Sequence, residues 1–119
     1  MTATTIAHEY ARAWLGGDVE KALSLVADDI VGQTPGGEIR GRDAFRRLLE
    51  PFATILISSE LIDVVGDDHH AAAVYAVETP FAKVFHGMEY LTVEDGLITH
   101  AITVFDRLPA FQARAAQPS

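Results

Sequence analysis

The segment Phe81–Val93, with the sequence FAKVFHGMEYLTV, decides the fold of this chain because it alternates in the manner of a β-strand. In an extended strand, successive side chains point to opposite faces. One face carries Phe85, Gly87, Glu89, Leu91 and Val93. The opposite face carries His86, Met88, Tyr90 and Thr92. Both sets contain large apolar side chains, so we expect both faces of the strand to be at least partly covered.

Three more long strands are predicted around this segment. They are expected over residues 55–65, 70–79 and 97–106. Residues typical of turns separate the strands, namely Asp67-Asp68, Thr79-Pro80 and Glu94-Asp95-Gly96. A shorter hairpin, over residues 30–34 and 38–40, is predicted through Pro35-Gly36-Gly37.

Three helices are predicted in the first half of the chain. Ile6, Tyr10 and Trp14 recur every four residues and indicate a helix over residues 4–15 with one apolar side. A second helix is expected to begin at the N-cap Asp18 and to close at Asp28-Asp29, and it carries Ala22, Leu23 and Val26. Beyond Gly41, a third helix is limited by Pro51, and its apolar side carries Phe45, Leu48, Leu49 and Phe52.

Helices followed by a run of strands predict an α+β fold, in which three N-terminal helices cover one face of an antiparallel sheet. The domain is expected to span residues 1–108, followed by a flexible tail over residues 109–119. If the helices cover the face that carries Glu89, the opposite face, with Met88 and Tyr90, is a dimer surface. We therefore expect a homodimer.

The composition limits the classes of partner. The chain has 119 residues, of which 49% are hydrophobic, and its formal net charge is -8. This charge repels phosphate backbones and anionic lipids, so we expect neither a nucleic acid nor a membrane as partner. The chain has no cysteine, which excludes disulfide and thiol chemistry. No export signal and no run of 18 apolar residues is visible, so we expect a cytoplasmic protein.

Several short segments resemble, in order and spacing, the SnoaL-like group of the nuclear transport factor 2-like superfamily. They are Tyr10–Trp14, Gly17–Glu20, Ala27–Ile30, Gly41–Phe45 and Gly96–Ile98. The resemblance implies a cystatin-like cone of three helices and a bent sheet around a pocket, often in dimers. The superfamily includes steroid isomerases, polyketide cyclases, dehydratases, epoxide hydrolases and noncatalytic proteins, so the fold alone does not define the function.

Within the superfamily, a resemblance to ketosteroid isomerase implies particular site residues. Tyr10 takes the position of the isomerase tyrosine, and Glu89 takes the position of its neutral acid. Where that enzyme has an aspartate base before proline, this chain has Thr34-Pro35. Phe105, two residues past Thr103, matches an aromatic residue of the pocket wall. The resemblance thus implies two oxyanion-hole donors without the proton-transfer group.

The carboxyl of Glu89 is the clearest chemical signal in the sequence. It is surrounded by apolar and aromatic side chains, namely Phe85, Leu91, Tyr10 and Trp14. Poor solvation predicts a raised pKa for Glu89 and a protonated acid near neutral pH, which together with Tyr10 would hold a ligand carbonyl oxygen. Two structural alternatives stay open. In these alternatives, Tyr10 and Trp14 are ordinary core aromatics, and Glu89 makes a structural hydrogen bond or an ion pair with an arginine such as Arg46 or Arg47.

The histidines offer a metal site or a general base. His69-His70 lie beside Asp67-Asp68 in a predicted turn where neighbouring side chains diverge, which favours a solvated turn over metal binding. His86 and His100 lie on adjacent strands and form a cross-strand pair if they share a face. If the strand register shifts by one residue, His100 faces the pocket and becomes the candidate base. We expect no metal and no cofactor.

Three functions are consistent with the sequence. The first is an enzyme that isomerises, cyclises or dehydrates a hydrophobic carbonyl compound, with Tyr10 and Glu89 as donors and Thr34 or His100 assisting. The second is a noncatalytic binder of a lipophilic small molecule. The third is a dimerising structural or regulatory module with a filled cavity. For the first two, the predicted pocket wall consists of Trp14, Phe45, Leu49, Phe52, Tyr75, Phe85, Thr103 and Phe105.

Overall fold

Three helices and six strands make up the part of the chain that the computed structural model describes, residues 2–105. The helices are α1 (Ala3–Leu15), α2 (Val19–Ser24) and α3 (Arg42–Thr54). The strands are β1 (Val26–Thr34), β2 (Gly37–Arg40), β3 (Ser58–Gly66), β4 (His70–Thr79), β5 (Ala82–Glu94) and β6 (Leu97–Phe105). The tail predicted over residues 109–119 lies outside the described residues.

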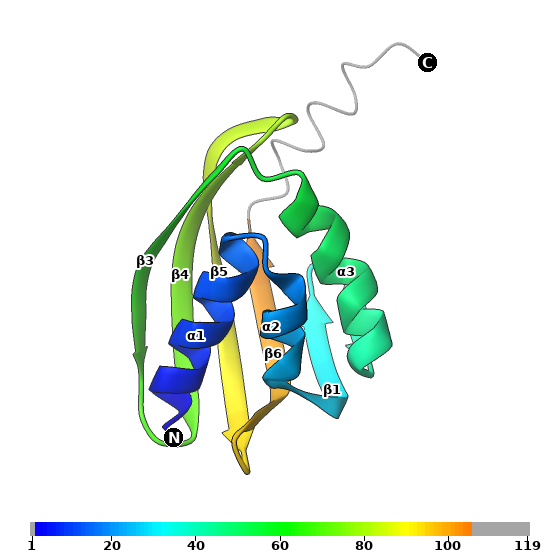
Figure 1. The fold of residues 1–119 in the computed structure, drawn as a ribbon, viewed down its shortest axis with the longest axis vertical. Coiled ribbons are helices and arrows are strands. Elements are labelled where there is room, and N and C mark those ends of the chain that lie inside the picture. Colours follow the sequence, from blue (N-terminus) through cyan, green and yellow to red (C-terminus); the bar gives the residue numbers. More distant parts are fainter. Residues whose placement is uncertain (1, 106–119) are drawn as a thin grey trace.

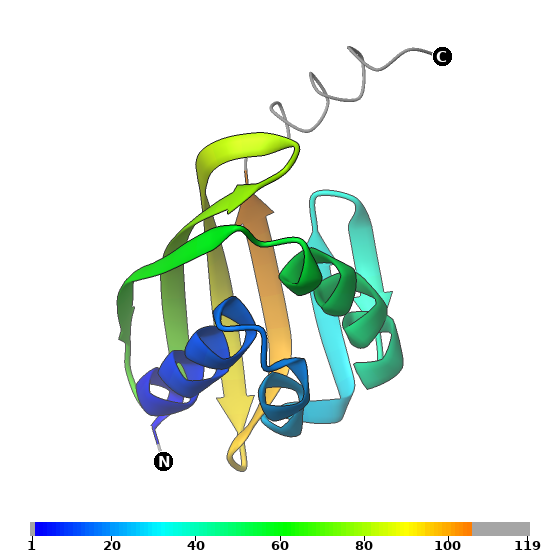
Figure 2. The ribbon, with the colours of Figure 1, turned by 45° about the horizontal axis from the view of Figure 1, so that its top comes forward.

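The strands form one curved sheet in the order β2-β1-β6-β5-β4-β3, and the helices lie together on its concave side (Figures 1 and 2). The predicted α+β cone of helices on a curved sheet is therefore confirmed. Helix α1 packs mainly on β3 and β4, whereas α3 packs on β1 and β2. None of the helices in the described range is long and apolar enough to cross a membrane.

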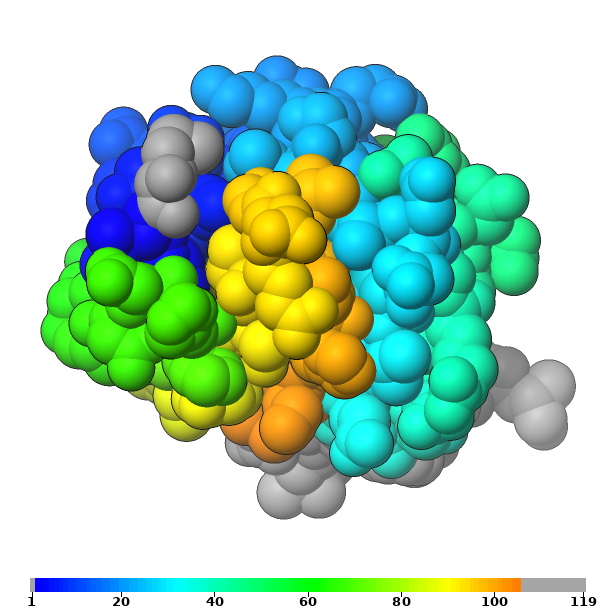
Figure 3. Space-filling view, turned by 90° about the horizontal axis from the view of Figure 1, so that it is seen from below, coloured from blue at the N-terminus to red at the C-terminus, as the bar shows by residue number. Residues whose placement is uncertain are grey.

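The sheet is mixed, which corrects the prediction of a purely antiparallel one. Strand β1 pairs with β6 in parallel, with Gly32 opposite Ala101, and the other strand pairs are antiparallel. The reason is that α2 leads into β1 from the same end of the molecule at which the β5–β6 turn leads into β6. Figure 3 shows this end from below, with the yellow β5–β6 turn beside the light-blue start of β1.

The second helix is shorter than predicted, because Val26 belongs to β1 and not to α2. The Ile98 amide donates to the Leu25 carbonyl at 2.8 Å, and Val26 lies opposite Ile98 in the ladder with β6. Pairing with β6 buries Val26 completely. A helix as short as α2 has few internal hydrogen bonds, so strand pairing determines the conformation from residue 26 onward.

Helix α1 has the buried side that the sequence predicts. Ile6 and Tyr10 are fully buried and Trp14 is 2% exposed. The Thr2 hydroxyl caps the helix by accepting the Thr5 amide at 3.2 Å. After Leu15 the chain turns through Gly17, whose φ of +88° is a conformation that glycine adopts without strain.

Strand β5 has the two faces that its sequence predicts. Glu89 is 3% exposed and Leu91 is fully buried on the concave side, beneath the helices. On the convex side, Met88 and Tyr90 are 39% and 44% exposed. The alternation of β5 is thus confirmed, and it turns the carboxyl of Glu89 toward the interior.

Candidate functional site

A cavity of about 410 Å³ lies between α3, the C-terminal end of α1 and the concave side of strands β4 to β6. Its size falls within the range of ~300–1,000 Å³ typical of small-molecule sites. The rim includes the half-exposed Leu48 and Ile55, whereas Trp14, Tyr75 and Glu89 line it and are almost completely buried. The remaining lining residues are Phe45, Leu49, Pro51, Phe52, Thr103 and Phe105. The cavity is thus an apolar pocket with a single carboxyl in its wall.

The two oxygens of Glu89 have different surroundings. Oε2 accepts a hydrogen bond from the Tyr10 hydroxyl at 3.2 Å and another from the Thr103 hydroxyl at 3.3 Å. Oε1 is buried and has no hydrogen-bond partner among the described residues. One oxygen therefore anchors the carboxyl to the protein, and the other is buried without a hydrogen bond to a described residue.

The predicted alternative of an ion pair between Glu89 and Arg46 is wrong. Its guanidinium pairs instead with Glu20 and Glu50, which are exposed. No salt bridge between described residues involves Glu89. The carboxyl is therefore held by hydroxyl groups and not by a buried ion pair.

Burial raises the pKa of Glu89 to about 7, although hydrogen bonds from Tyr10 and Thr103 and the nearby indole N–H of Trp14 act in the opposite direction. Burial, together with the neighbouring Glu89, also raises the pKa of Tyr10 and of Tyr75 above the ordinary value of a phenol. Both phenols therefore keep their protons at neutral pH. Glu89 is the group of this cluster that changes its charge near neutrality.

Tyr10 lies beside Glu89, as the resemblance implies, but it does not line the cavity. It is fully buried behind the carboxyl, and its ring lies 6.3 Å from that of Phe45. Tyr10 and Glu89 therefore do not both face the cavity. Instead, the phenol supports the carboxyl of Glu89, and Glu89 forms part of the cavity wall.

Most of the predicted wall residues surround the cavity. Those that line it are Trp14, Phe45, Leu49, Phe52, Tyr75, Thr103 and Phe105. Phe85 is the exception, because it stands behind Phe52, with 6.5 Å between the ring centres. The sequence interpretation did not assign Leu48, Pro51 and Ile55 to the wall, although the apolar side of the third helix was a signal for Leu48.

The aromatic rings of the wall brace one another. The Trp14 and Tyr75 rings meet edge to face with their centres 5.0 Å apart, and Phe52 stacks on Phe105 at 6.3 Å. Gly87 makes room for this arrangement, because a Cβ at this position would lie 2.5 Å from the Tyr75 ring. The wall is thus held in place by packing before any ligand binds.

The two residues that the sequence offered as assisting groups lie away from the cavity. The Thr34 hydroxyl donates to the Gly37 carbonyl at 3.0 Å and accepts the Gly36 amide at 3.1 Å in the β1–β2 turn. His100 is exposed on the convex side of β6, opposite Thr92. The register therefore rules out His100 as a base in this cavity.

The predicted pair of His86 and His100 is wrong as well. His100 lies opposite Thr92, six residues along β5 from His86. The Asp67 carboxylate accepts the amides of His69 and His70, each at 2.8 Å, and thereby closes the β3–β4 turn. Within residues 2–105, no group of three or more His, Asp or Glu side chains is arranged to hold a metal ion.

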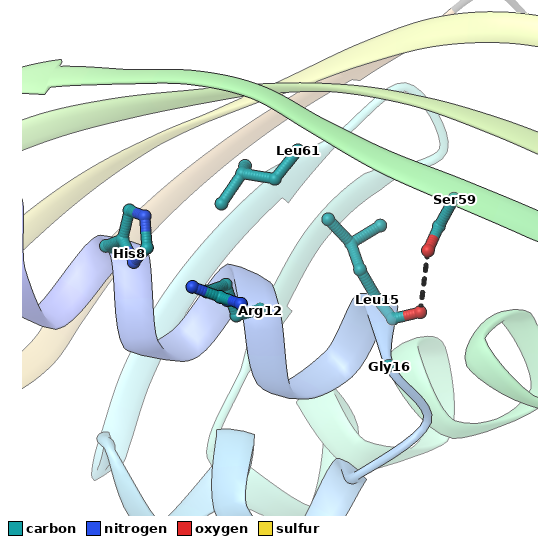
Figure 4. Close-up of a pocket in the computed structure, with 6 residues that line it drawn as sticks. All are labelled: His8, Arg12, Leu15, Gly16, Ser59 and Leu61. Atoms are coloured by element: carbon teal, nitrogen blue, oxygen red, sulfur yellow. Dashed lines mark hydrogen bonds between the residues drawn. The ribbon is translucent and has the colours of Figure 1, made fainter.

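A second hollow lies between α1 and β3, lined by His8, Arg12, Leu15, Gly16, Ser59 and Leu61 (Figure 4). The hydrogen bond drawn there joins the Ser59 hydroxyl to the Leu15 carbonyl at 2.9 Å and fastens β3 to the end of α1. His8 and Arg12 are exposed to solvent. We therefore assign the functional site to the apolar cavity, where buried polar atoms lack partners.

Solved structures share this architecture along nearly the whole chain. A protein from Kribbella flavida DSM 17836 is 43% identical, with a TM-score of 0.93, and the alignment covers 97% of this chain and 95% of that one. A proposed polyketide cyclase from Pseudomonas putida KT2440 is 20% identical, with a TM-score of 0.76, over 95% of this chain and 98% of that one. A proposed ketosteroid isomerase from Kribbella flavida is also 20% identical, with a TM-score of 0.73, over 87% of this chain and 77% of that one.

None of the curated proteins matches this chain. One domain family does match, and the match covers elements that build the pocket. The SnoaL-like domain matches residues 7–101, which include α3, all of β5 and most of α1. Cavity, fold and family together are those of a small-molecule pocket protein. The chain therefore belongs to the SnoaL-like domain family.

Proposed function

We propose that this protein binds a small hydrophobic carbonyl compound, whose oxygen accepts a hydrogen bond from the protonated carboxyl of Glu89. The observation that carries the proposal is the unpartnered Oε1 of Glu89 in the wall of an apolar cavity. A buried polar atom without a partner destabilises a protein, so such atoms normally meet a ligand or another polar group. An open cavity also favours a binding protein over a filled structural module.

The hydrogen bonds to Glu89 determine where its proton sits. The hydroxyls of Tyr10 and Thr103 both donate to Oε2, so this oxygen acts as the carbonyl side of the neutral acid. The proton of neutral Glu89 is then on Oε1, the oxygen without a partner. A carbonyl oxygen accepts such a bond, and the surrounding aromatic side chains suit a hydrocarbon skeleton.

Binding is favoured over turnover because the described wall offers no second group that takes up a proton. Its titratable residues are Tyr75 and Glu89, and burial keeps Tyr75 protonated. An isomerase, cyclase or dehydratase of this architecture would have to use Glu89 itself for proton transfer. The carbonyl chemistry of the proposed cyclase and isomerase among the structural relatives supports the ligand class.

The test uses 2-tetralone, a bicyclic ketone that enolises. Binding is followed by the fluorescence of Trp14, the single tryptophan of the chain, and turnover by exchange of the ketone's α-protons in deuterated water. We expect saturable binding without exchange above the buffer rate. Exchange that is accelerated by the wild type and lost in Glu89→Gln and Tyr10→Phe would establish the enzyme instead. Absence of binding would refute the proposal.

We also propose that the convex side of the sheet pairs with a second copy of the chain. Met88 lies opposite Val104 and Tyr90 opposite Ile102, and all four side chains are 39–49% exposed. Such an apolar patch is typical of an interface. Sedimentation should show a dimer that Tyr90→Glu dissociates, whereas Lys21→Glu leaves it intact. A monomeric wild type would contradict this proposal.

A further inference from the structure

We infer that the last turn of α3, residues 51–54, is a gate through which a ligand enters the apolar cavity, and that the Phe52 ring closes it. This inference rests on the proposed ligand binding and names the element that has to move for it. Three features carry the inference, namely the closed inner wall, the position of Phe52 and the uneven way in which α3 is fastened to the rest of the protein.

The inner wall of the cavity is closed off from solvent. Trp14 and Tyr75 are each 2% exposed and Glu89 is 3% exposed, although all three line the cavity. By contrast, Leu48 and Ile55 line the cavity from the side of α3 and are 40% and 36% exposed. A ligand that contacts Glu89 therefore has to pass the α3 side, and part of the wall has to move to admit it.

The Phe52 ring bridges the cavity from α3 to the elements opposite. Its centre lies 5.9 Å from the Trp14 ring of α1, 6.5 Å from the Phe85 ring of β5 and 6.3 Å from the Phe105 ring of β6. Phe52 itself is only half-buried. Because all these contacts come from one ring, displacing Phe52 removes the closure on three sides together.

The first half of α3 is fastened to its neighbours by charged hydrogen bonds. The Arg42 guanidinium donates twice to the Val26 carbonyl, at 2.6 and 3.1 Å, and pairs with Asp28 at 2.7 Å. One turn later, Arg46 pairs with Glu20 of α2. These contacts fix the N-terminal half of the helix to β1 and α2.

The last turn of α3 lacks such fastening. Pro51 has no amide hydrogen, so the Arg47 carbonyl loses its helical donor, and a proline inside a helix also favours a kink. The Thr54 hydroxyl donates to the Glu50 carbonyl at 2.7 Å, a contact that often bends helices. Within residues 2–105, no hydrogen bond or ion pair joins residues 51–56 to another helix or strand. The next anchor is the Ile57 amide, which donates to the Glu78 carbonyl at 2.8 Å, where the chain leads into β3 (Figure 1).

The first experiment measures amide hydrogen exchange and needs no ligand. Helices α1 and α3 both have 13 residues, so the last turn of α1 is a matched control for the ordinary fraying of a helix end. Corrected for intrinsic rates, the amides of residues 52–54 should exchange about tenfold or more faster than those of residues 13–15. Pro51→Ala restores a donor to the Arg47 carbonyl and should slow exchange at residues 52–54 about tenfold or more. Equal exchange in the two turns, or no slowing in the variant, would overturn the gate.

The second experiment follows the binding of 2-tetralone by stopped-flow fluorescence of Trp14. A gate controls entry and exit alike, so Pro51→Ala should slow association and dissociation by a similar factor, about tenfold, and leave the affinity nearly unchanged. Phe52→Ala removes the closing ring and should speed association. Arg47→Ala alters an exposed side chain of the same helix that does not line the cavity, and it should leave both rates unchanged.

The outcomes distinguish the gate from the proposed function. If 2-tetralone binds and Pro51→Ala leaves both rates unchanged, the gate is refuted while ligand binding in the cavity stands. An affinity that falls in Pro51→Ala at an unchanged association rate refutes the gate as well, because Pro51 then acts only as a wall residue. If 2-tetralone does not bind, the proposed function fails, and hydrogen exchange by itself supports or refutes the opening of the last turn of α3.

Discussion

Replacing Glu89 by glutamine should change how the stability of the protein depends on pH. The glutamine amide oxygen still accepts the hydroxyls of Tyr10 and Thr103, so the contacts at Oε2 are kept. What the variant loses is the titration of a buried carboxyl. The difference in unfolding free energy between variant and wild type therefore isolates the proton of Glu89, because the other titratable groups are common to both.

The sign and size follow from the pKa of Glu89, which burial raises from 4.5 to about 7 in the folded protein. Between these values the folded wild type holds a proton that the unfolded chain has released, so rising pH favours unfolding. At about 1.4 kcal/mol per pH unit, the wild type loses about 3 kcal/mol of stability by pH 8. Glu89→Gln lacks this loss, so its stability relative to the wild type should rise by about 3 kcal/mol between pH 4.5 and pH 8.

Urea unfolding of both proteins at pH 4.5, 5.5, 6.5, 7.5 and 8.5 measures this difference directly. The difference in free energy should grow up to about pH 7 and then level off. A difference that stays constant from pH 4.5 to 8.5 would show that the carboxyl is solvated or ion-paired in solution. Such a result would refute the assignment of Glu89 as a buried neutral acid.

Three further predictions follow from the same geometry. The affinity for 2-tetralone should be constant below pH 7 and fall about tenfold per pH unit above it, because the ionised Glu89 no longer donates a hydrogen bond. In Glu89→Gln, this affinity should not depend on pH. Tyr10→Phe should raise the pKa of Glu89 further, since the Tyr10 hydrogen bond lowers it, and a carboxyl titration by ¹³C NMR would detect this. Gly87→Ala should cost about 1–3 kcal/mol in urea unfolding, because the new methyl group overlaps the buried Tyr75 ring; an unchanged midpoint would contradict the packing described.

Local periodicity predicted the elements that line the pocket. The alternation of β5 placed Glu89 on the buried face, and the four-residue spacing of Ile6, Tyr10 and Trp14 placed the aromatic side of α1. Both features depend only on neighbours along the chain, since the period of a helix or a strand directs each side chain to a face. The contact between Tyr10 and Glu89 came from the family resemblance and not from periodicity.

The structure decided what depends on pairing between distant segments. The pairing of β1 with β6 ended α2 before Val26, and the β5–β6 register turned His100 outward. Neither follows from local pattern, because a register shift of one residue reverses every side chain on a strand.

The sequence by itself determined an α+β fold with an acidic residue, Glu89, on an apolar strand face, and the family resemblance implied the cone shape. Only the tertiary structure decided that Tyr10 stands behind this carboxyl and that Trp14 stands beside it at the cavity. The physical reason is that hydrogen-bond partners are chosen by distance and direction in space. Tyr10 and Glu89 are 79 residues apart along the chain, and their contact exists only once the helix has packed on the sheet.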